Sequence, residues 1–406
     1  MSAQPALPSS GPGVADLVPT ARTSAPADSV EIFPLDSEEM RSVARAGGAI
    51  YDSWMRYWQT LEPSERDPLS HPACVAGHLE GHLRSKTAST TKVLVTFGGG
   101  EALSLLPVVT ARRAALAHAR GFNSMSWALA RSDHGATLDA LFATRFRCGH
   151  VDSLYLESVE ATNDLLEVDW PHVHRPRHFR SLIALRDGYG AVLARMSANG
   201  RKSVRRLLKR ISRDHEIDLE TITEPERLDH GFERYLQVED RSWKQQHGRA
   251  LRERPRECES LRWSLNHLAR DRRTVFQFLR AGDTDIAAQL CAVIDRQLLV
   301  LKTSFDTDWA NYGAGKLLLA ESMRTWCPDR DIDAVNLVSG LDWHLQWAPR
   351  LLDSHTLWMF ASGVRGQLAR LRDVPPQENA KILLHDLGLE RPARWLQRLG
   401  HRGRQN

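Results

Sequence analysis

The feature that most constrains this chain is a run of three predicted strands that leads into a glycine turn and a helix. β-branched and apolar residues mark the strands, and two-residue turns separate them. An apolar helix over 316–326 follows, and a further strand over 334–338 should return parallel to the third strand. This order predicts an α+β layer with one splayed parallel pair. The three strands are expected at 275–279, 286–293 and 297–302.

The remaining sequence alternates between helical and strand patterns. The stretch at 171–176 is rich in proline and histidine and is interpreted as a linker. A helix over 191–213 carries many arginines and lysines opposite one apolar stripe. Further helices are expected at 37–58, 72–86, 225–243 and 257–270, and further strands at 92–97, 102–110, 154–156 and 182–185.

Length and composition limit the class of protein. The 406 residues suggest two domains, and the net charge of +4 does not call for nucleic acid. No apolar run is long enough to span a membrane, the N-terminus lacks the pattern of a secretory signal, and residues 1–30 have the composition of a disordered segment. The five scattered cysteines argue against a disulfide framework and against a zinc site. A cytoplasmic location without a metal is therefore expected, and His172, His174 and His178 are interpreted as linker histidines.

The turn Tyr312-Gly313-Ala314-Gly315-Lys316 lies where a strand should meet the N-terminus of a helix. The first backbone N–H groups of a helix lack internal partners, and glycines let an anion approach them closely. A pyrophosphate suits such a place, with Lys316 as an additional cation. The alternative is an ordinary turn, since the segment matches neither a Walker loop nor a dinucleotide-binding motif.

Four ordered motifs together resemble the CelD/BcsL-type acetyltransferases, a branch of the GNAT superfamily tied by name to cellulose biosynthesis. The basic helix at 201–210 is similar to an arginine-rich helix of that family. Two positions differ from the family pattern, with Ala310 in the donor loop and His344 in place of a lysine. The four motifs are Asp283–Ala288, Thr303–Trp309, Tyr312–Leu318 and Val338–Trp347.

The resemblance implies a fold and a reaction. The family is similar to the Fem-type transferases, which implies two tandem GNAT-like domains with mixed, mostly antiparallel sheets flanked by helices. The acceptor would attack an acyl thioester directly, with acetyl-CoA or another acyl-CoA as donor and a sugar or polysaccharide precursor as acceptor. The implied segments are a disordered 1–30, a degenerate GNAT-like domain at 31–175, the acyltransferase domain at 176–362 and a basic helical tail at 363–406.

Roles for individual residues follow from the matched motifs, each beside a plainer alternative. Asp342, His344 and Asp306 are the candidates for acid–base catalysis or substrate orientation, and the alternatives are a solvated turn, a packing histidine and a local turn bond. Trp243, Trp343 and Trp347 could line the acceptor site or pack in a core. Glu239 lies on the helix that resembles the acceptor-facing helix of the family, with a solvated face as the alternative. The donor site is expected at Tyr312, Gly313, Ala314, Gly315 and Lys316.

Three functions remain open from the sequence. The first is acyl-CoA-dependent acetylation of a sugar or polysaccharide precursor. The second is a Fem-like transfer from aminoacyl-tRNA, for which the basic helix would bind RNA. The third is a non-catalytic accessory protein of polysaccharide synthesis, suggested by Ala310 in the donor loop.

Overall fold

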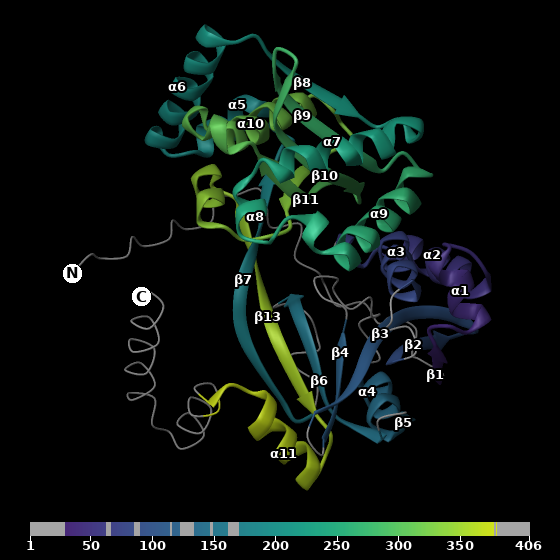
Figure 1. Ribbon diagram of the computed structural model, residues 1–406. Helices are drawn as coiled ribbons and strands as arrows, with labels where there is room; N and C mark the ends of the chain where they lie inside the picture. Colours follow the sequence, from purple (N-terminus) through teal and green to yellow (C-terminus); the bar gives the residue numbers. More distant parts are fainter. Residues whose placement is uncertain are drawn as a thin grey trace.

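The computed structural model contains one continuous sheet that runs through two halves of the molecule (Figure 1). Two long strands, β7 (His172–Ala184) and β13 (Arg350–Phe360), pair with each other and connect the halves. The strand order is β1-β2-β3-β4-β6-β13-β7-β12-β11-β10-β9-β8, with the short β5 paired to β6. The structure describes residues 29–61, 66–84, 90–113, 116–121, 134–146, 149–160, 170–376 and 379.

The first half is formed by the described residues between 29 and 160. Strands β2, β3 and β4 pair antiparallel to one another. Helix α4 follows β4, and the chain then returns as β6, which pairs with β4 in parallel. Apolar side chains of α1, α2 and α3 pack on the sheet around Trp54 and Leu79. The elements are β1 (Ser29–Pro34), α1 (Glu38–Ala44), α2 (Ala49–Thr60), η2 (Pro68–Ser70), α3 (Pro72–Leu83), β2 (Thr91–Gly98), β3 (Glu101–Arg113), β4 (Leu116–Gly121), α4 (His134–Ala143), β5 (Arg145–Phe146) and β6 (Gly149–Glu160).

The second half repeats this order with β9, β10, β11, α10 and β12. The expected three strands and the parallel return strand are confirmed, and Asp295 and Arg296 both have the positive φ of a tight hairpin turn. Helices cover both faces of the sheet, with α7 and α9 on one face and α5, α6 and α10 on the other. The elements are α5 (Gly188–Arg195), α6 (Ala198–Asp214), β8 (Ile217–Ile222), η5 (Pro225–Arg227), α7 (Leu228–Asp240), α8 (Trp243–Gln246), η6 (Leu251–Glu253), α9 (Pro255–Ala269), β9 (Thr274–Ala281), β10 (Thr284–Ile294), β11 (Gln297–Phe305), η7 (Thr307–Tyr312), α10 (Ala314–Trp326), β12 (Ala334–Leu337), η8 (Asp342–Trp347) and α11 (Val364–Asp373).

Three expectations about elements are wrong in detail. The segment at 171–176 is not a linker, because it forms the start of β7 and pairs with β13. The helix expected at 37–58 is broken at Gly48, whose φ of 86° is not helical. The helix expected at 191–213 is broken at Met196, which is extended, and Ser197 then caps α6 by accepting from the N–H of Gly200.

The expected boundary at 175/176 falls inside β7, and β13 pairs with β6 of the first half. No helix among the described residues combines the length and the apolar content that crossing a bilayer requires. The arrangement is a mixed α+β fold in which antiparallel pairs outnumber parallel ones and helices flank the sheet, as the sequence predicted.

The two halves are held together where α3 packs against α9. A Cβ atom added at Gly77 would lie 2.2 Å from the backbone nitrogen of Ser264, and one at Gly81 would lie 2.8 Å from the Cα of Ser260. The helices therefore approach as closely as their backbones allow. The Ser264 hydroxyl donates to the carbonyl of Cys74 at 3.0 Å. Small residues four apart on both helices make this docking possible.

Replacing Gly77 by alanine should lower the free energy of unfolding by about 2 kcal/mol or more, because the added methyl group meets backbone that cannot move aside. Gly190→Ala is the matched control, since a Cβ at that helical position meets no atom within 4 Å. Denaturant unfolding of both variants measures the difference. Equal stabilities would contradict the close packing of α3 on α9.

Candidate active site

The parallel pair β11–β12 separates after only three paired residues. Gln297, Leu298 and Leu299 pair with residues of β12, whereas β11 continues beside β10 as far as Phe305. At the same place β11 carries a β-bulge, because Leu290 of β10 faces Lys302 while Cys291 faces Val300. Leu301 is thus an extra residue that bends the strand. The divergence opens one edge of β11 from about the bulge onward.

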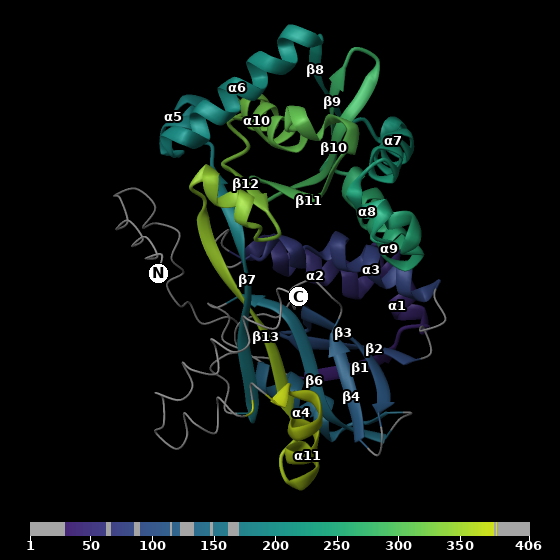
Figure 2. The same cartoon turned by 60° about the vertical axis from the view of Figure 1, so that its left-hand side comes forward.

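The backbone of Thr303 faces this open edge. The N–H of Asp306 donates to the carbonyl of Ile286 on β10, which sets the alternation of hydrogen-bonded pairs along the two strands. Thr303, opposite Gln289, falls in a pair that is not hydrogen-bonded, so its N–H and C=O point away from β10. Figure 2 shows α10 over the ends of β11 and β12, with α8 beside β11. The open edge is therefore a place where a bound chain can add hydrogen bonds to the sheet.

The glycine turn forms the N-terminus of α10. Gly313 has a left-handed backbone, with φ 66° and ψ 40°, and its carbonyl accepts from the N–H groups of Lys316 and Leu317. The N–H groups of Ala314 and Gly315 precede the first intrahelical bonds. The positive φ favours a glycine at position 313, and a Cβ there would lie 2.8 Å from a terminal methyl group of Leu207 on α6, which would have to shift.

Basic side chains from α6 lie next to this helix end. The Arg210 guanidinium donates to the carbonyl of Asn311 at 3.2 Å and lies 5.1 Å from the centre of the Tyr312 ring. The Lys316 ammonium donates to the Ser203 hydroxyl at 3.4 Å. Burial, and to a smaller extent the charge of Arg206, lowers the pKa of Lys316. The turn therefore combines free N–H groups, a helix dipole and at least three cations, which suits a phosphate anion.

Both carboxylate oxygens of Asp306 accept hydrogen bonds from the protein itself. One carboxylate oxygen accepts from the N–H of Asp308 at 3.0 Å and caps η7, which is the local turn bond considered from the sequence. The other oxygen accepts from the Arg241 guanidinium at 2.7 Å, and the side chain is buried. Both oxygens are thus engaged in positioning the segment between β11 and the glycine turn.

Asp342 and His344 lie in η8, beyond the end of β12. Asp342 is exposed. His344 is buried, its Nδ1 accepts from the N–H of Leu341 at 3.3 Å, and burial lowers its pKa to about 4. The imidazole is therefore neutral at pH 7 and closes the turn that begins η8.

The three tryptophans have different surroundings. Trp347 is fully buried in the core with Ile183 and Leu319, so its indole packs between the sheet and α10. Trp243 and Trp343 are 40% and 38% exposed, in α8 and η8. Of the three tryptophans, Trp243 and Trp343 therefore present indole surface to solvent.

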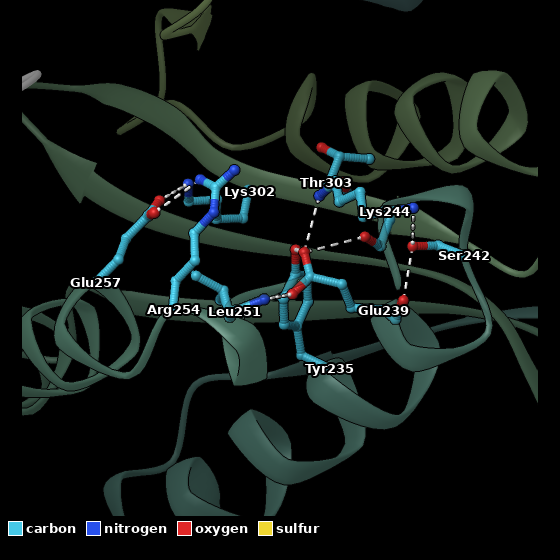
Figure 3. Close-up of polar contacts among 10 residues, drawn as sticks. Tyr235, Glu239, Ser242, Lys244, Leu251, Arg254, Glu257, Lys302 and Thr303 are labelled. Atoms are coloured by element: carbon cyan, nitrogen blue, oxygen red, sulfur yellow. Dashed lines mark hydrogen bonds and ion pairs between the residues drawn. The ribbon is translucent and has the colours of Figure 1, made fainter. Parts of the chain in front are cut away.

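A buried polar cluster joins α7 to α8, and of its members the sequence singled out Glu239 but not its pairing with Lys244. Glu239 is 1% exposed, so the solvated-face interpretation is wrong for this residue. Its carboxylate accepts from Lys244 at 2.9 Å, from the Tyr235 hydroxyl at 3.1 Å and from the N–H of Leu251 at 2.7 Å (Figure 3). The Lys244 ammonium also donates to the carbonyl of Thr303 at 2.7 Å. The sequence signal for this cluster is weak, because Glu239-x-x-x-x-Lys244 is an ordinary spacing.

A second lysine–glutamate pair lies on the same face of β11. Lys302 and Glu257 form an ion pair, and Glu257 also accepts from Arg254 at 2.9 Å (Figure 3). Lys302 is 30% exposed, against 18% for Lys244. The two lysines differ in position, since the Lys302 ammonium reaches toward α9 whereas the Lys244 ammonium reaches the edge of β11.

Residues 198–344 match the family model of the acetyltransferase (GNAT) domain. The matched segment contains α6, the β9–β11 meander, the glycine turn, α10 and β12. This segment of the second half therefore has a GNAT-type acyltransferase fold. No curated protein matches the chain.

Solved structures with a similar course of the chain share little sequence with it. The C-terminal domain of a putative lysylphosphatidylglycerol synthetase from Agrobacterium fabrum is 12% identical, with 82% of this chain and 95% of that one covered and a TM-score of 0.48. FemX is 10% identical over 69% of this chain and 90% of its own, with a TM-score of 0.46. A tandem GNAT protein from the clavulanic acid biosynthesis pathway is 13% identical over 82% and 100%, with a TM-score of 0.43.

Within the described residues, no three His, Cys, Asp or Glu side chains are grouped to hold a metal ion. His172 and His174 lie on β7, with ring centres 6.0 Å apart, and the side chain of His178 lies outside the described residues.

The neutral His344 makes stability depend on pH in a defined direction. Its pKa is about 4 in the folded protein against an ordinary 6.5, so the unfolded chain binds the proton more tightly. The stability that this residue contributes is complete above about pH 6.5 and is lost as the pH falls toward 4. As the pH falls from 7 to 5, the Tm of His344→Gln should decrease less than the Tm of the wild type. The exposed His230→Gln is the control, and equal slopes in all three proteins would refute the assignment.

Proposed function

We propose that this protein transfers an acyl group from acyl-CoA to an acceptor amine or hydroxyl, with the donor bound along the open edge of β11. The separation of β12 from β11 after Leu299, combined with the free N-terminus of α10, is the observation that carries the proposal. The GNAT domain match over the same residues supports it. Acetyl-CoA is the simplest donor.

The donor would lie across both features. Its pyrophosphate fits the N–H groups of Ala314 and Gly315, with Lys316 and Arg206 as nearby cations. Its pantetheine amides would bond to the free edge of β11 as an added strand does. The thioester would then reach the region between Thr303 and the bulge at Leu301, where the strands have separated.

The acceptor would approach between α8 and η8. Trp243 and Trp343 offer exposed aromatic surface there, which favours packing against the apolar face of a sugar ring. Asp342 is exposed beside Trp343, which makes it the candidate among the sequence-predicted carboxylates for accepting the proton of the acceptor. A sugar or polysaccharide precursor remains our proposal for the acceptor, in a protein that acts in the cytoplasm.

One observation favours a second candidate function. The side chains of Lys202, Arg205, Arg206, Lys209, Arg210 and Arg213 are exposed on α6. Such a strip of cations beside the donor site also suits the phosphates of an aminoacyl-tRNA. Under this reading the acyl group would be an amino acid carried by RNA rather than an acyl chain carried by CoA.

Replacing Arg206 by alanine should weaken acetyl-CoA binding by about tenfold or more, because one charge-assisted contact to a phosphate is lost. Arg205→Ala removes the same charge from the opposite flank of α6 and should leave binding within about twofold. Isothermal titration calorimetry with acetyl-CoA measures both. The absence of acetyl-CoA binding at millimolar donor, together with salt-sensitive tRNA binding that Arg205→Ala also weakens, would favour the tRNA-dependent reaction instead.

A further inference from the structure

Lys244 brings a cation to the open edge of β11, along which the proposed donor would lie. Its ammonium donates to the carbonyl of Thr303, whose backbone faces the open edge of β11. Thr303 lies four positions beyond Leu299, the last residue of β11 that pairs with β12. The Lys244 ammonium therefore lies at the part of β11 that has separated from β12, at the residue that follows Lys302 and close to the bulge at Leu301.

The Lys244 ammonium is held in place by Glu239 of α7, a helix that packs on one face of the sheet. Glu239 projects from α7 and accepts from Lys244 at 2.9 Å, while Ser304 of β11 lies 3.4 Å from the same carboxylate oxygen. Glu239 is itself fixed by the Tyr235 hydroxyl and by the N–H of Leu251 (Figure 3). Because every contact of Glu239 comes from a different turn or strand, its carboxylate has little freedom to move.

An ammonium has three N–H donors, and Glu239 and Thr303 take two of them. Among the described residues no further acceptor bonds to the Lys244 ammonium, whose side chain is still 18% exposed. A buried ion pair stabilises a fold little compared with packed apolar groups. The position of this pair at an opening, with a donor left over, indicates a role beyond stability.

We propose that Lys244 is a catalytic residue of the acyl transfer and that its third N–H donates to the thioester oxygen of the donor. This inference rests on the proposed function, because it assumes an acyl thioester along β11. Glu239 is a positioning residue that keeps the ammonium at the strand edge.

The step balances without a further reactant. The acceptor nitrogen or oxygen forms a bond to the thioester carbon, and the carbon–oxygen π electrons move onto the oxygen, where the Lys244 ammonium stabilises the charge. When the carbonyl re-forms, the carbon–sulfur bond breaks and its electron pair leaves with the sulfur. The acceptor loses one proton and the CoA thiolate gains one, so Lys244 ends as it began.

The first test measures the stretching frequency of the thioester carbonyl, so the acceptor does not have to be known. The full chain is mixed with acetyl-CoA labelled with carbon-13 at the carbonyl, and the infrared stretch of the bound thioester is recorded. A hydrogen bond from an ammonium lowers this stretching frequency relative to free acetyl-CoA. We expect the lowered frequency in the wild type and in Lys302→Met, and a return toward the free value in Lys244→Met.

Lys302→Met is the matched control, because it also removes a partly buried lysine paired with a glutamate on the same face of β11. Both variants therefore lose an ion pair, and only Lys244→Met loses the ammonium at the edge. Thermal unfolding of the two variants shows whether each remains folded. If Lys244→Met does not fold, Lys244→Gln replaces it, since its shorter neutral amide keeps a donor near Glu239.

The second test measures turnover with hydroxylamine as a small acceptor probe and the release of free CoA thiol as the signal. Lys244→Met should lower kcat at least about 100-fold, the loss typical for one oxyanion donor. The KM for acetyl-CoA should change little, and Lys302→Met should keep kcat within about threefold.

The outcomes separate the two proposals. If the wild type binds acetyl-CoA but Lys244→Met keeps both the lowered carbonyl frequency and kcat, Lys244 is structural and only the inference of this subsection is overturned. If the wild type does not bind acetyl-CoA at all, the proposed function fails, and the role of Lys244 fails with it.

Discussion

The divergence of β12 from β11 is the constraint on which the rest of the second half depends. Strands normally satisfy their backbone hydrogen bonds through both neighbours, and an open edge inside a protein leaves donors and acceptors without partners. Here the pairing stops after Leu299 although β11 continues to Phe305. The open edge is tolerated because β11 pairs with β10 along its other edge, and because the Lys244 ammonium donates a hydrogen bond to the carbonyl of Thr303.

The first half has the same strand order around its own parallel pair, but the features that suit a donor are concentrated in the second half. β4 pairs with β6 in parallel, as β11 does with β12. The glycine turn, the basic face of α6 and the Glu239–Lys244 pair all lie between residues 198 and 316. The first half instead contributes support through α3, whose Gly77 and Gly81 let α9 approach, and α9 in turn packs beside α7.

Much of this arrangement follows from local patterns in the sequence. The strands of the meander could be predicted because their apolar runs are bounded by two-residue turns, and the parallel return strand follows from the intervening helix. The start of β7 could not, because His172 to Pro176 have no strand pattern of their own and are held in the sheet by β13, which lies far along the chain. Long-range pairing overrides local composition in such a strand.

The site was predictable only in part, for a similar reason. The glycine turn was found because glycines beside a helix start are a local signal, and the structure places it at the N-terminus of α10. The candidate roles of Asp342 and the exposed tryptophans remain predictions. Lys244 and Glu239 were missed as a pair because their meaning depends on Thr303, some sixty positions away, which no spacing within α7 and α8 reveals.

Hydrogen–deuterium exchange of the full chain with and without acetyl-CoA tests the donor site most directly, because it reports on backbone amides rather than on one side chain. If the donor occupies the open edge, exchange should slow in peptides covering Thr303 to Lys316, at the end of β11 and the first turn of α10, and remain unchanged in peptides covering β4 and β6. Protection confined to the first half, or none at donor concentrations that saturate binding, would contradict the account.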